Sequence, residues 1–184
     1  MSKSISPIIH KYTSDNADDI FAIAIKVFSH DGPKPVNDIL DMKNVLHDEH
    51  TKGWYMKTDK PISFIIFSED DFTHRFGSIW SYLEFIGTDT NYTGHGYAKH
   101  LLEMYLNDNK DRTIYLHVMN NTPHTERLIK WYSKYGFKIV SKIMSGRATT
   151  MVRFLDNVDE ANFWKVIHDE RTNTHIDHTE WCVY

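Results

Sequence analysis

The residues from Thr93 to Ala98, Thr-Gly-His-Gly-Tyr-Ala, carry the strongest chemical signal in the sequence. Gly94 and Gly96 lack a Cβ atom, so the backbone can bend sharply there and approach a ligand closely. An amphipathic helix is predicted to follow, and the N–H groups and dipole at a helix N-terminus suit a phosphate group. The pattern differs from a Walker A loop, which needs Gly-Lys-Ser/Thr. It differs also from a dinucleotide fingerprint, because Lys99 stands where the third glycine belongs. The sequence therefore predicts an anion-binding loop of another kind.

Glu84 is the candidate general base. It lies in the predicted strand Ser78–Gly87, where alternation places Trp80, Tyr82, Glu84 and Ile86 on one face. We expect a carboxylate among aromatic rings to have a raised pKa, which suits proton acceptance near neutral pH. The alternative is a structural carboxylate that faces solvent or pairs with a lysine.

Histidines supply the weaker candidates. His117, on the predicted strand Ile114–Val118, is a reserve base because an unperturbed imidazole has a pKa near 6.5. A metal site in the C-terminal tail is conceivable but lacks a standard zinc spacing, and we expect no metal; its residues would be His168, His175, His178 and Cys182.

Two motifs in the right order resemble the GNAT N-acetyltransferase superfamily. Thr93 to Ala98 resembles its acetyl-CoA motif, [QR]-x-x-G-x-[GA], with Thr93 at the Arg/Gln position. Trp131-Tyr132-Ser-Lys-Tyr-Gly136-Phe137 resembles the signature L-Y-x-x-x-G-F. Tyr82-Leu-Glu84 also resembles the corresponding strand of spermidine/spermine N-acetyltransferases, whose equivalent glutamate is proposed as the base. The similarity extends from about residue 5 to residue 155.

The resemblance implies a fold, a co-substrate and site residues. The fold is a mixed α/β sheet, mostly antiparallel with one splayed parallel strand pair and helices on both faces. Acetyl-CoA is the implied co-substrate, and Tyr132 is the implied acid that protonates the departing thiolate; the alternative for Tyr132 is core packing. Lys99 or His95 is a candidate to supply the charge that Thr93 lacks, and Thr125 takes the place of a frequent asparagine. The implied cofactor-binding residues are Ile86, Gly87, Thr88, Thr93, Gly94, His95, Gly96, Tyr97, Ala98, Lys99 and Thr125.

These candidates need a regular series of elements to position them. Ser78–Gly87, the loop and the next helix lead to Ile114–Val118 as a parallel crossover. Hydrophobic periodicity and turn residues predict the remaining elements: strands at 5–12, 53–57 and 62–68, helices at 14–28 and 37–47, a polar turn at 69–77, a helix from Thr122 to Gly136, and a hairpin of 136–143 with 149–155.

Composition and charge bound the class of protein. The chain has 184 residues, a formal net charge of −4 and one cysteine, which excludes an internal disulfide. No apolar stretch reaches the roughly 18 residues of a membrane span, and no signal peptide is readable, so we expect a cytoplasmic protein. Without a basic excess, we expect neither nucleic-acid nor membrane binding.

The acidity lies at the C-terminal end. Residues 156–184 hold two basic and seven acidic residues, a net charge of −5, whereas residues 1–155 have a net charge of +1. We therefore expect a catalytic domain over 1–155 and an acidic extension over 156–184. A helix with Val158, Ala161, Trp164 and Ile167 on one side and a strand at 178–184 would pack on the domain or on a dimer partner.

The expected function is direct transfer of an acetyl group to a primary amine. The acidic tail and the Tyr82-Leu-Glu84 resemblance favour a small cationic amine such as a polyamine. The alternatives are a peptide N-terminus or lysine as acceptor, and a protein that binds acyl-CoA without transferring the acyl group.

Overall fold

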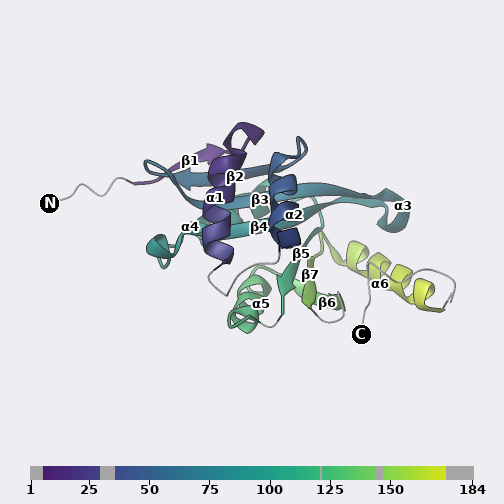
Figure 1. Ribbon diagram of the computed structural model, residues 1–184. Coiled ribbons are helices and arrows are strands. Elements are labelled where there is room, and N and C mark those ends of the chain that lie inside the picture. The colour runs from purple at the N-terminus through teal and green to yellow at the C-terminus, as the bar shows by residue number, and fades with distance from the viewer. Residues whose placement is uncertain (1–5, 30–35, 121, 144–146, 173–184) are drawn as a thin grey trace. The chain divides into compact units, whose positions relative to one another are not determined.

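The computed structural model describes residues 6–29, 36–120, 122–143 and 147–172 (Figure 1). Its elements follow the order β1 (Ile8–Lys11), a 3₁₀ turn (Ser14–Asn16), α1 (Ala17–Phe28), α2 (Val36–His47), β2 (Lys52–Lys57), β3 (Pro61–Phe72), α3 (Thr73–Phe76), β4 (Ser78–Thr88), a second 3₁₀ turn (Thr90–Tyr92), α4 (Tyr97–Asp108), β5 (Ile114–Met119), α5 (Thr125–Ser133), β6 (Lys138–Ile143), β7 (Ala148–Arg153) and α6 (Asn157–Thr172).

The strands are hydrogen-bonded in the order β1-β2-β3-β4-β5-β7-β6. Neighbouring strands are mostly antiparallel, and α4 provides the crossover of the one parallel pair, β4 and β5. This confirms the predicted mixed sheet. By its internal contacts the chain divides into two compact units, residues 1–68 with 83–108 and residues 69–82 with 109–184. Strands β3 and β4 each contribute residues to both units.

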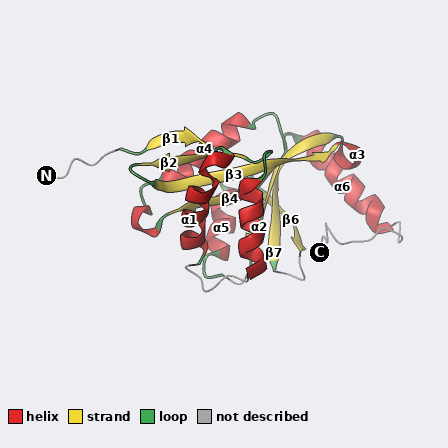
Figure 2. Ribbon diagram, turned by 45° about the horizontal axis from the view of Figure 1, so that its top comes forward, coloured by secondary structure: helices red, strands yellow, loops and turns green. Residues whose placement is uncertain are grey.

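The first unit has helices on both faces of its strands, with α1 and α2 on one face and α4 on the other (Figures 1 and 2). On the α4 face, Phe67 of β3 contacts the buried Tyr105 ring, with centroids 4.7 Å apart. The core beneath α1 and α2 joins helix and strand residues that are all buried, among them Tyr12, Ile20, Ala24, Leu46, Tyr55, Phe64 and Ile66. The aliphatic and aromatic side chains of α1 and β3 thus pack against β4, the strand that leads into the Thr93–Ala98 loop.

The second unit is built on β5, β7 and β6, which pair antiparallel. Its core is largely aromatic, and Trp80, 1% exposed, stacks on Phe76 with centroids 4.7 Å apart. Helix α6 contributes Phe163 and Ile167 to the same cluster. Asp156 accepts hydrogen bonds from the backbone N–H groups of Val158 and Asp159 and so caps the N-terminus of α6.

Two predictions of local structure are wrong. The expected polar turn at 69–77 is the end of β3 followed by α3, because Phe72 and Phe76 pack against each other and Trp80. On α6, Val158 is 75% exposed and Trp164 38%, and the helix instead buries Phe163 beside Ile167. The predicted strand at 178–184 lies outside the described residues.

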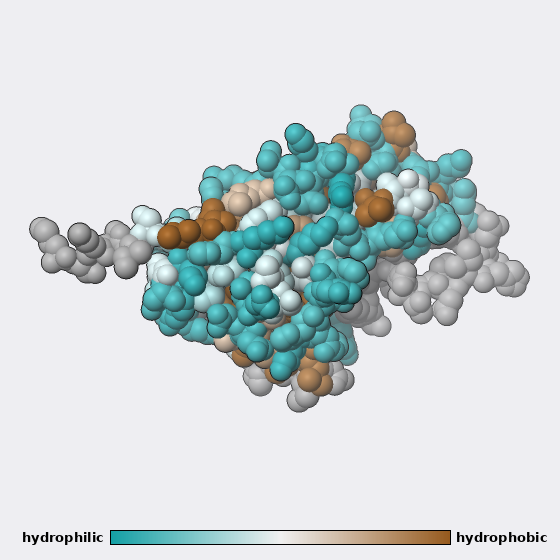
Figure 3. Space-filling model, turned by 90° about the horizontal axis from the view of Figure 1, so that it is seen from above, coloured by the Kyte–Doolittle hydropathy of each residue, from teal (hydrophilic) through white to brown (hydrophobic). Residues whose placement is uncertain are grey.

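The surface view agrees with the composition. Hydrophilic side chains predominate on the face shown in Figure 3, and hydrophobic ones form only small groups. Within the described residues, no helix combines the length and the apolar character needed to cross a bilayer.

Candidate functional site

The loop between β4 and α4 has the backbone geometry that its glycines predict. Gly94 and Gly96 adopt φ angles of 81° and 80°, in the left-handed region. No heavy atom lies within 4 Å of where a Cβ would stand at either glycine. Glycine is therefore required here for backbone conformation and leaves open space above the loop.

The loop also offers unpaired hydrogen-bond donors. None of the backbone N–H groups from Gly94 to Lys99 donates to an acceptor among the described residues, and the first helical bond runs from His100 to the Gly96 carbonyl, 2.9 Å. Residues 93–96 are exposed. Six consecutive free donors at the start of a 12-residue helix fit a diphosphate, whose oxygens only accept hydrogen bonds.

Side chains of the loop brace it internally. Thr93 Oγ1 donates to the Thr90 carbonyl, 3.0 Å, and His95 Nδ1 lies 3.0 Å from the Thr93 carbonyl oxygen. The His95 and Tyr97 rings stack, with centroids 5.6 Å apart. Lys99 Nζ lies 3.7 Å from a Glu103 carboxylate oxygen, one turn further along α4.

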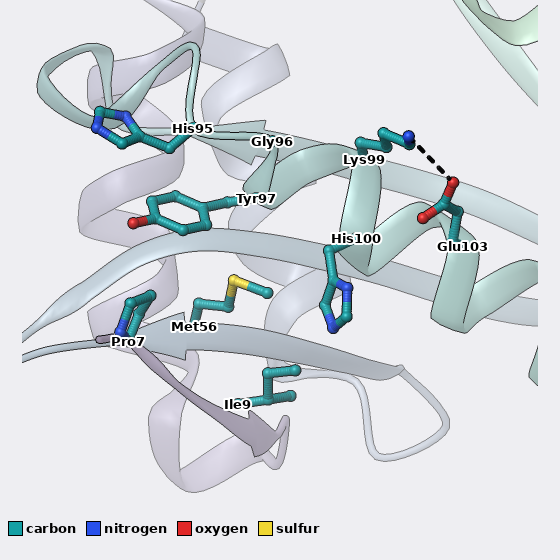
Figure 4. A pocket seen from close by; sticks show the side chains of 9 residues that line it. All are labelled: Pro7, Ile9, Met56, His95, Gly96, Tyr97, Lys99, His100 and Glu103. Atoms are coloured by element: carbon teal, nitrogen blue, oxygen red, sulfur yellow. Dashed lines mark ion pairs between the residues drawn. The ribbon is translucent and has the colours of Figure 1, made fainter.

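A cavity of about 480 Å³ adjoins the loop (Figure 4). The His95 and Tyr97 rings lie on one side of it, and the His100 ring points toward Ile9 and Met56. Lys99 and Glu103 turn toward each other. The cavity thus combines an apolar floor from β1 and β2 with polar groups from α4.

Glu84 lies on β4 in the first unit, together with the loop. Its side chain is partly buried, and its Oε1 accepts a hydrogen bond from Ser68 Oγ, 2.8 Å. Ser68, at the end of the first-unit part of β3, was not singled out from the sequence. No local sequence pattern indicates Ser68, because it meets Glu84 only when β3 and β4 pack together. The Ser68 bond holds the carboxylate in one orientation.

The end of β4 is closely packed. A Cβ at Gly87 would lie 2.9 Å from the Phe64 ring and 3.0 Å from Val27, so glycine allows α1 and β3 to approach. Ser63 Oγ donates to the Gly87 carbonyl, 2.9 Å, and lies 2.8 Å from Thr88 Oγ1. Gly87 therefore has a packing role. Its carbonyl already accepts a hydrogen bond from Ser63, whose hydroxyl also contacts Thr88.

Tyr132 lies on α5 in the second unit and is 6% exposed. Its ring packs edge-on against Phe137, with centroids 5.7 Å apart, and Gly136 after the helix has a φ of 86°. Burial raises the pKa of the Tyr132 hydroxyl well above its usual value. The hydroxyl has no hydrogen-bond partner among the described residues, so it is a protonated donor available to a ligand.

The second unit holds the remaining candidates, Thr125 and His117. Thr125 Oγ1 donates to the Met119 carbonyl, 2.9 Å, at the start of α5. His117 Nδ1 lies 3.1 Å from Thr150 Oγ1, and burial lowers the pKa of the imidazole to about 4, although Asp70 opposes this. His117 is consequently neutral at physiological pH.

Aromatic contacts around His117 were not anticipated from the sequence. The Tyr82 and Tyr115 rings stack 4.5 Å apart, and the Tyr115 hydroxyl donates to Asp70. Alternation places Tyr82 on the same face as Glu84. Its stacking on Tyr115 depends on the register between β4 and β5, which the sequence pattern does not give.

Metal ligands do not cluster in the part of the chain that the structure describes. Three of the four tail residues considered as a metal site, His175, His178 and Cys182, lie outside that part.

Solved acetyltransferases share the fold of this chain. The NatC complex bound to Gag peptide and CoA contains a chain that matches with a TM-score of 0.62 and 20% identity, over 83% of this chain and 100% of that one. PaiA N-acetyltransferase from Thermoplasma acidophilum, in complex with coenzyme A, matches with a TM-score of 0.59 and 16% identity, over 82% and 99%. Arabidopsis thaliana NAA60 with a bisubstrate analogue matches with a TM-score of 0.59 and 16% identity, over 81% and 98%.

A comparison with curated proteins finds no match. The model of the acetyltransferase (GNAT) family matches residues 17–137, from the start of α1 through the motif around Tyr132. This chain therefore belongs to the GNAT family of acetyltransferases.

Proposed function

We propose that this protein transfers the acetyl group of acetyl-CoA to a primary amine by direct attack of the amine on the thioester. The observation that carries the proposal is the row of free N–H donors from Gly94 to Lys99 in a glycine-bent loop. Such donors suit the diphosphate of coenzyme A and need no side-chain cation, so Thr93 at the Arg/Gln position is compatible with binding. Bound acetyl-CoA supplies the activated acyl group.

Glu84 is the proposed base. An alkylammonium with a pKa near 10.4 is neutral in only about one molecule in 2,500 at pH 7, so attack requires removal of a proton. Ser68 Oγ donates to Oε1 of this carboxylate, 2.8 Å, and so orients the group that takes the proton directly or through water.

Tyr132 is the proposed acid. Because its pKa is raised by burial, the hydroxyl keeps its proton at neutral pH and can donate to the departing thiolate sulfur. A hydroxyl donor beside the departing sulfur stabilises the negative charge that develops on the thiolate as the C–S bond breaks.

A small cationic amine is the proposed acceptor. The net charge of −5 over residues 156–184 and the Tyr82-Leu-Glu84 run support this class. A peptide amine is the second candidate, because NAA60 carries a bisubstrate analogue and the NatC complex a Gag peptide in structures that share this fold.

Calorimetric titration with acetyl-CoA, followed by assays of CoA release across amine classes, tests the proposal. We expect one binding site per chain and CoA release with diamines and polyamines. Turnover of peptides but not of small amines would reverse the acceptor assignment. Binding without CoA release over the whole panel would contradict acetyl transfer.

A further inference from the structure

An ion pair joins α1 to the start of the cofactor loop. Lys26 Nζ lies 2.6 Å from Asp89 Oδ2, and the side chains are 47% and 5% exposed. Asp89 is the residue between β4 and the second 3₁₀ turn, five positions before Gly94. A buried carboxylate is costly unless it is paired, so its presence here needs an explanation.

Asp89 uses every polar group that it has. Its N–H donates to the Ile62 carbonyl, 2.8 Å, and its carbonyl accepts from the Tyr92 N–H, 2.7 Å. Its Oδ1 accepts from the Asn91 N–H, 3.0 Å, and its Oδ2 takes the Lys26 bond. Strand β3, helix α1 and the turn before the loop are thereby held to one residue.

Local bonds continue this restraint to the glycines. The hydroxyl of Thr93 bonds to the Thr90 carbonyl and the ring of His95 to the Thr93 carbonyl, 3.0 Å each. Carbonyls and side chains make these contacts, so the N–H groups from Gly94 onward stay free. The loop is organised before ligand arrives, which reduces the entropy lost on binding.

We propose that Lys26 and Asp89 are positioning residues for acetyl-CoA: the pair holds the β4–α4 loop in its binding conformation, and Lys26 neutralises a carboxylate that would otherwise repel the diphosphate. Neither residue touches the reacting atoms. The inference rests on the proposed cofactor role of the loop and adds two residues to which no binding role was assigned from the sequence.

The two charges predict an unequal pattern among variants. Lys26→Met leaves Asp89 buried and unpaired, so we expect acetyl-CoA to bind roughly tenfold or more weakly. Asp89→Asn keeps an acceptor for the Asn91 N–H and removes the negative charge, so its loss should be smaller. Lys26→Met combined with Asp89→Asn should recover affinity toward that of Asp89→Asn alone, and Lys26→Arg should stay within about twofold of wild type.

Calorimetric Kd values for acetyl-CoA, with KM for the amine in parallel, measure this pattern. Lys43→Met on the exposed side of α2 and Asp59→Asn after β2 are matched controls, and both should leave the acetyl-CoA Kd unchanged. A folded Lys26→Met variant with wild-type affinity for acetyl-CoA would overturn the proposal. So would a double variant that binds more weakly than Lys26→Met.

A second readout needs no ligand. Amide hydrogen exchange of Asn91 and Tyr92, whose N–H groups bond to Asp89, should be faster in the free Lys26→Met and Asp89→Asn variants than in wild type and controls. Unchanged exchange there would contradict the positioning role even if acetyl-CoA proved not to bind. A wild-type protein that fails to bind acetyl-CoA would count against the proposed function, and the exchange data would still decide on the ion pair.

Discussion

Single residues carry the proposed proton transfers, and Glu84 is the first of them. Glu84→Gln keeps the size of the side chain and an acceptor for the Ser68 hydroxyl, but it cannot take a proton. We expect kcat/KM for the amine to fall about 100-fold or more at pH 7. The loss should shrink as the pH approaches the pKa of the free amine, because the amine then loses its proton unaided. A pH–rate profile measures this.

Glu126→Gln, at an exposed position on α5, serves as the matched control for Glu84 and should keep wild-type rates. An equal loss for Glu84→Gln at every pH would assign that residue a structural role.

Tyr132 is the second proposed proton-transfer residue. Removal of its hydroxyl should change the rate of acetyl transfer without changing the stability of the fold. Because no described residue bonds to that hydroxyl, Tyr132→Phe should leave the thermal midpoint nearly unchanged. We expect kcat to fall about 10-fold to 100-fold while the acetyl-CoA Kd stays within about twofold. Tyr135→Phe, three residues along the same segment, should change neither value. A reduced acetyl-CoA affinity at constant kcat would show that Tyr132 binds cofactor and does not act as the acid.

His117 makes stability depend on pH. Its pKa is about 4 in the folded protein, because burial disfavours the charged ring, and 6.5 is the ordinary value. Between these values the unfolded chain binds more protons, so stability is complete above pH 6.5 and falls as the pH drops toward 4. The loss is on the order of 3 kcal/mol.

Chemical denaturation of wild type and His117→Gln over pH 4–7 measures this dependence. The variant should show a flatter profile, whereas His50→Gln, at a side chain 84% exposed, should follow wild type. A wild-type slope in His117→Gln would assign the effect to other groups.

At the scale of elements, the loop between β4 and α4 makes the next prediction. Gly94→Ala and Gly96→Ala each place a Cβ in open space, so their cost is the left-handed backbone alone, about 1–2 kcal/mol. In the free protein the variant loop can relax to an unstrained conformation. To bind the diphosphate, it must return to the left-handed conformation, so the strain then opposes binding. We therefore expect the acetyl-CoA Kd to rise roughly tenfold in each variant.

Gly77→Ala is a matched control for the loop. Gly77 also has a φ of 80° with nothing within 4 Å of a Cβ, but it ends α3 in the second unit. Its replacement should lower stability by a similar amount and leave the acetyl-CoA Kd unchanged. If Gly94→Ala and Gly96→Ala bound acetyl-CoA with the same Kd as Gly77→Ala, the loop would be excluded as the diphosphate site.

Elements also show how far the sequence could predict this protein. The glycine loop and the helix before Gly136 follow from local chemistry, and both were predicted where they occur. Ser68, Ser63 and the Lys26–Asp89 pair join residues 16 to 63 positions apart, so no local pattern contains them. On α6 the periodicity predicted an apolar side that included Val158 and Trp164, whereas the packing of Phe163 against Phe76 buries a different side.

At the scale of the whole molecule, two strands connect the compact units. Strands β3 and β4 each continue from one unit into the other. Unfolding of one unit would therefore disrupt strands that the other unit also needs. We expect one cooperative thermal transition for the chain. Acetyl-CoA binds the folded state through the first-unit loop in our proposal, yet its stabilisation should reach both units.

Saturating acetyl-CoA measures that coupling. At 100 times Kd the ligand adds about 2.7 kcal/mol, which corresponds to a rise of roughly 5–10 °C in Tm for a chain of this size. Hydrogen exchange of slowly exchanging amides in β2, of the first unit, and β7, of the second, should slow by the same factor. The Gly94→Ala, Gly96→Ala double variant should show a smaller rise at the same ligand concentration. Two separate transitions, with only the β2 amides protected, would mean that the shared strands do not make the chain a single folding unit.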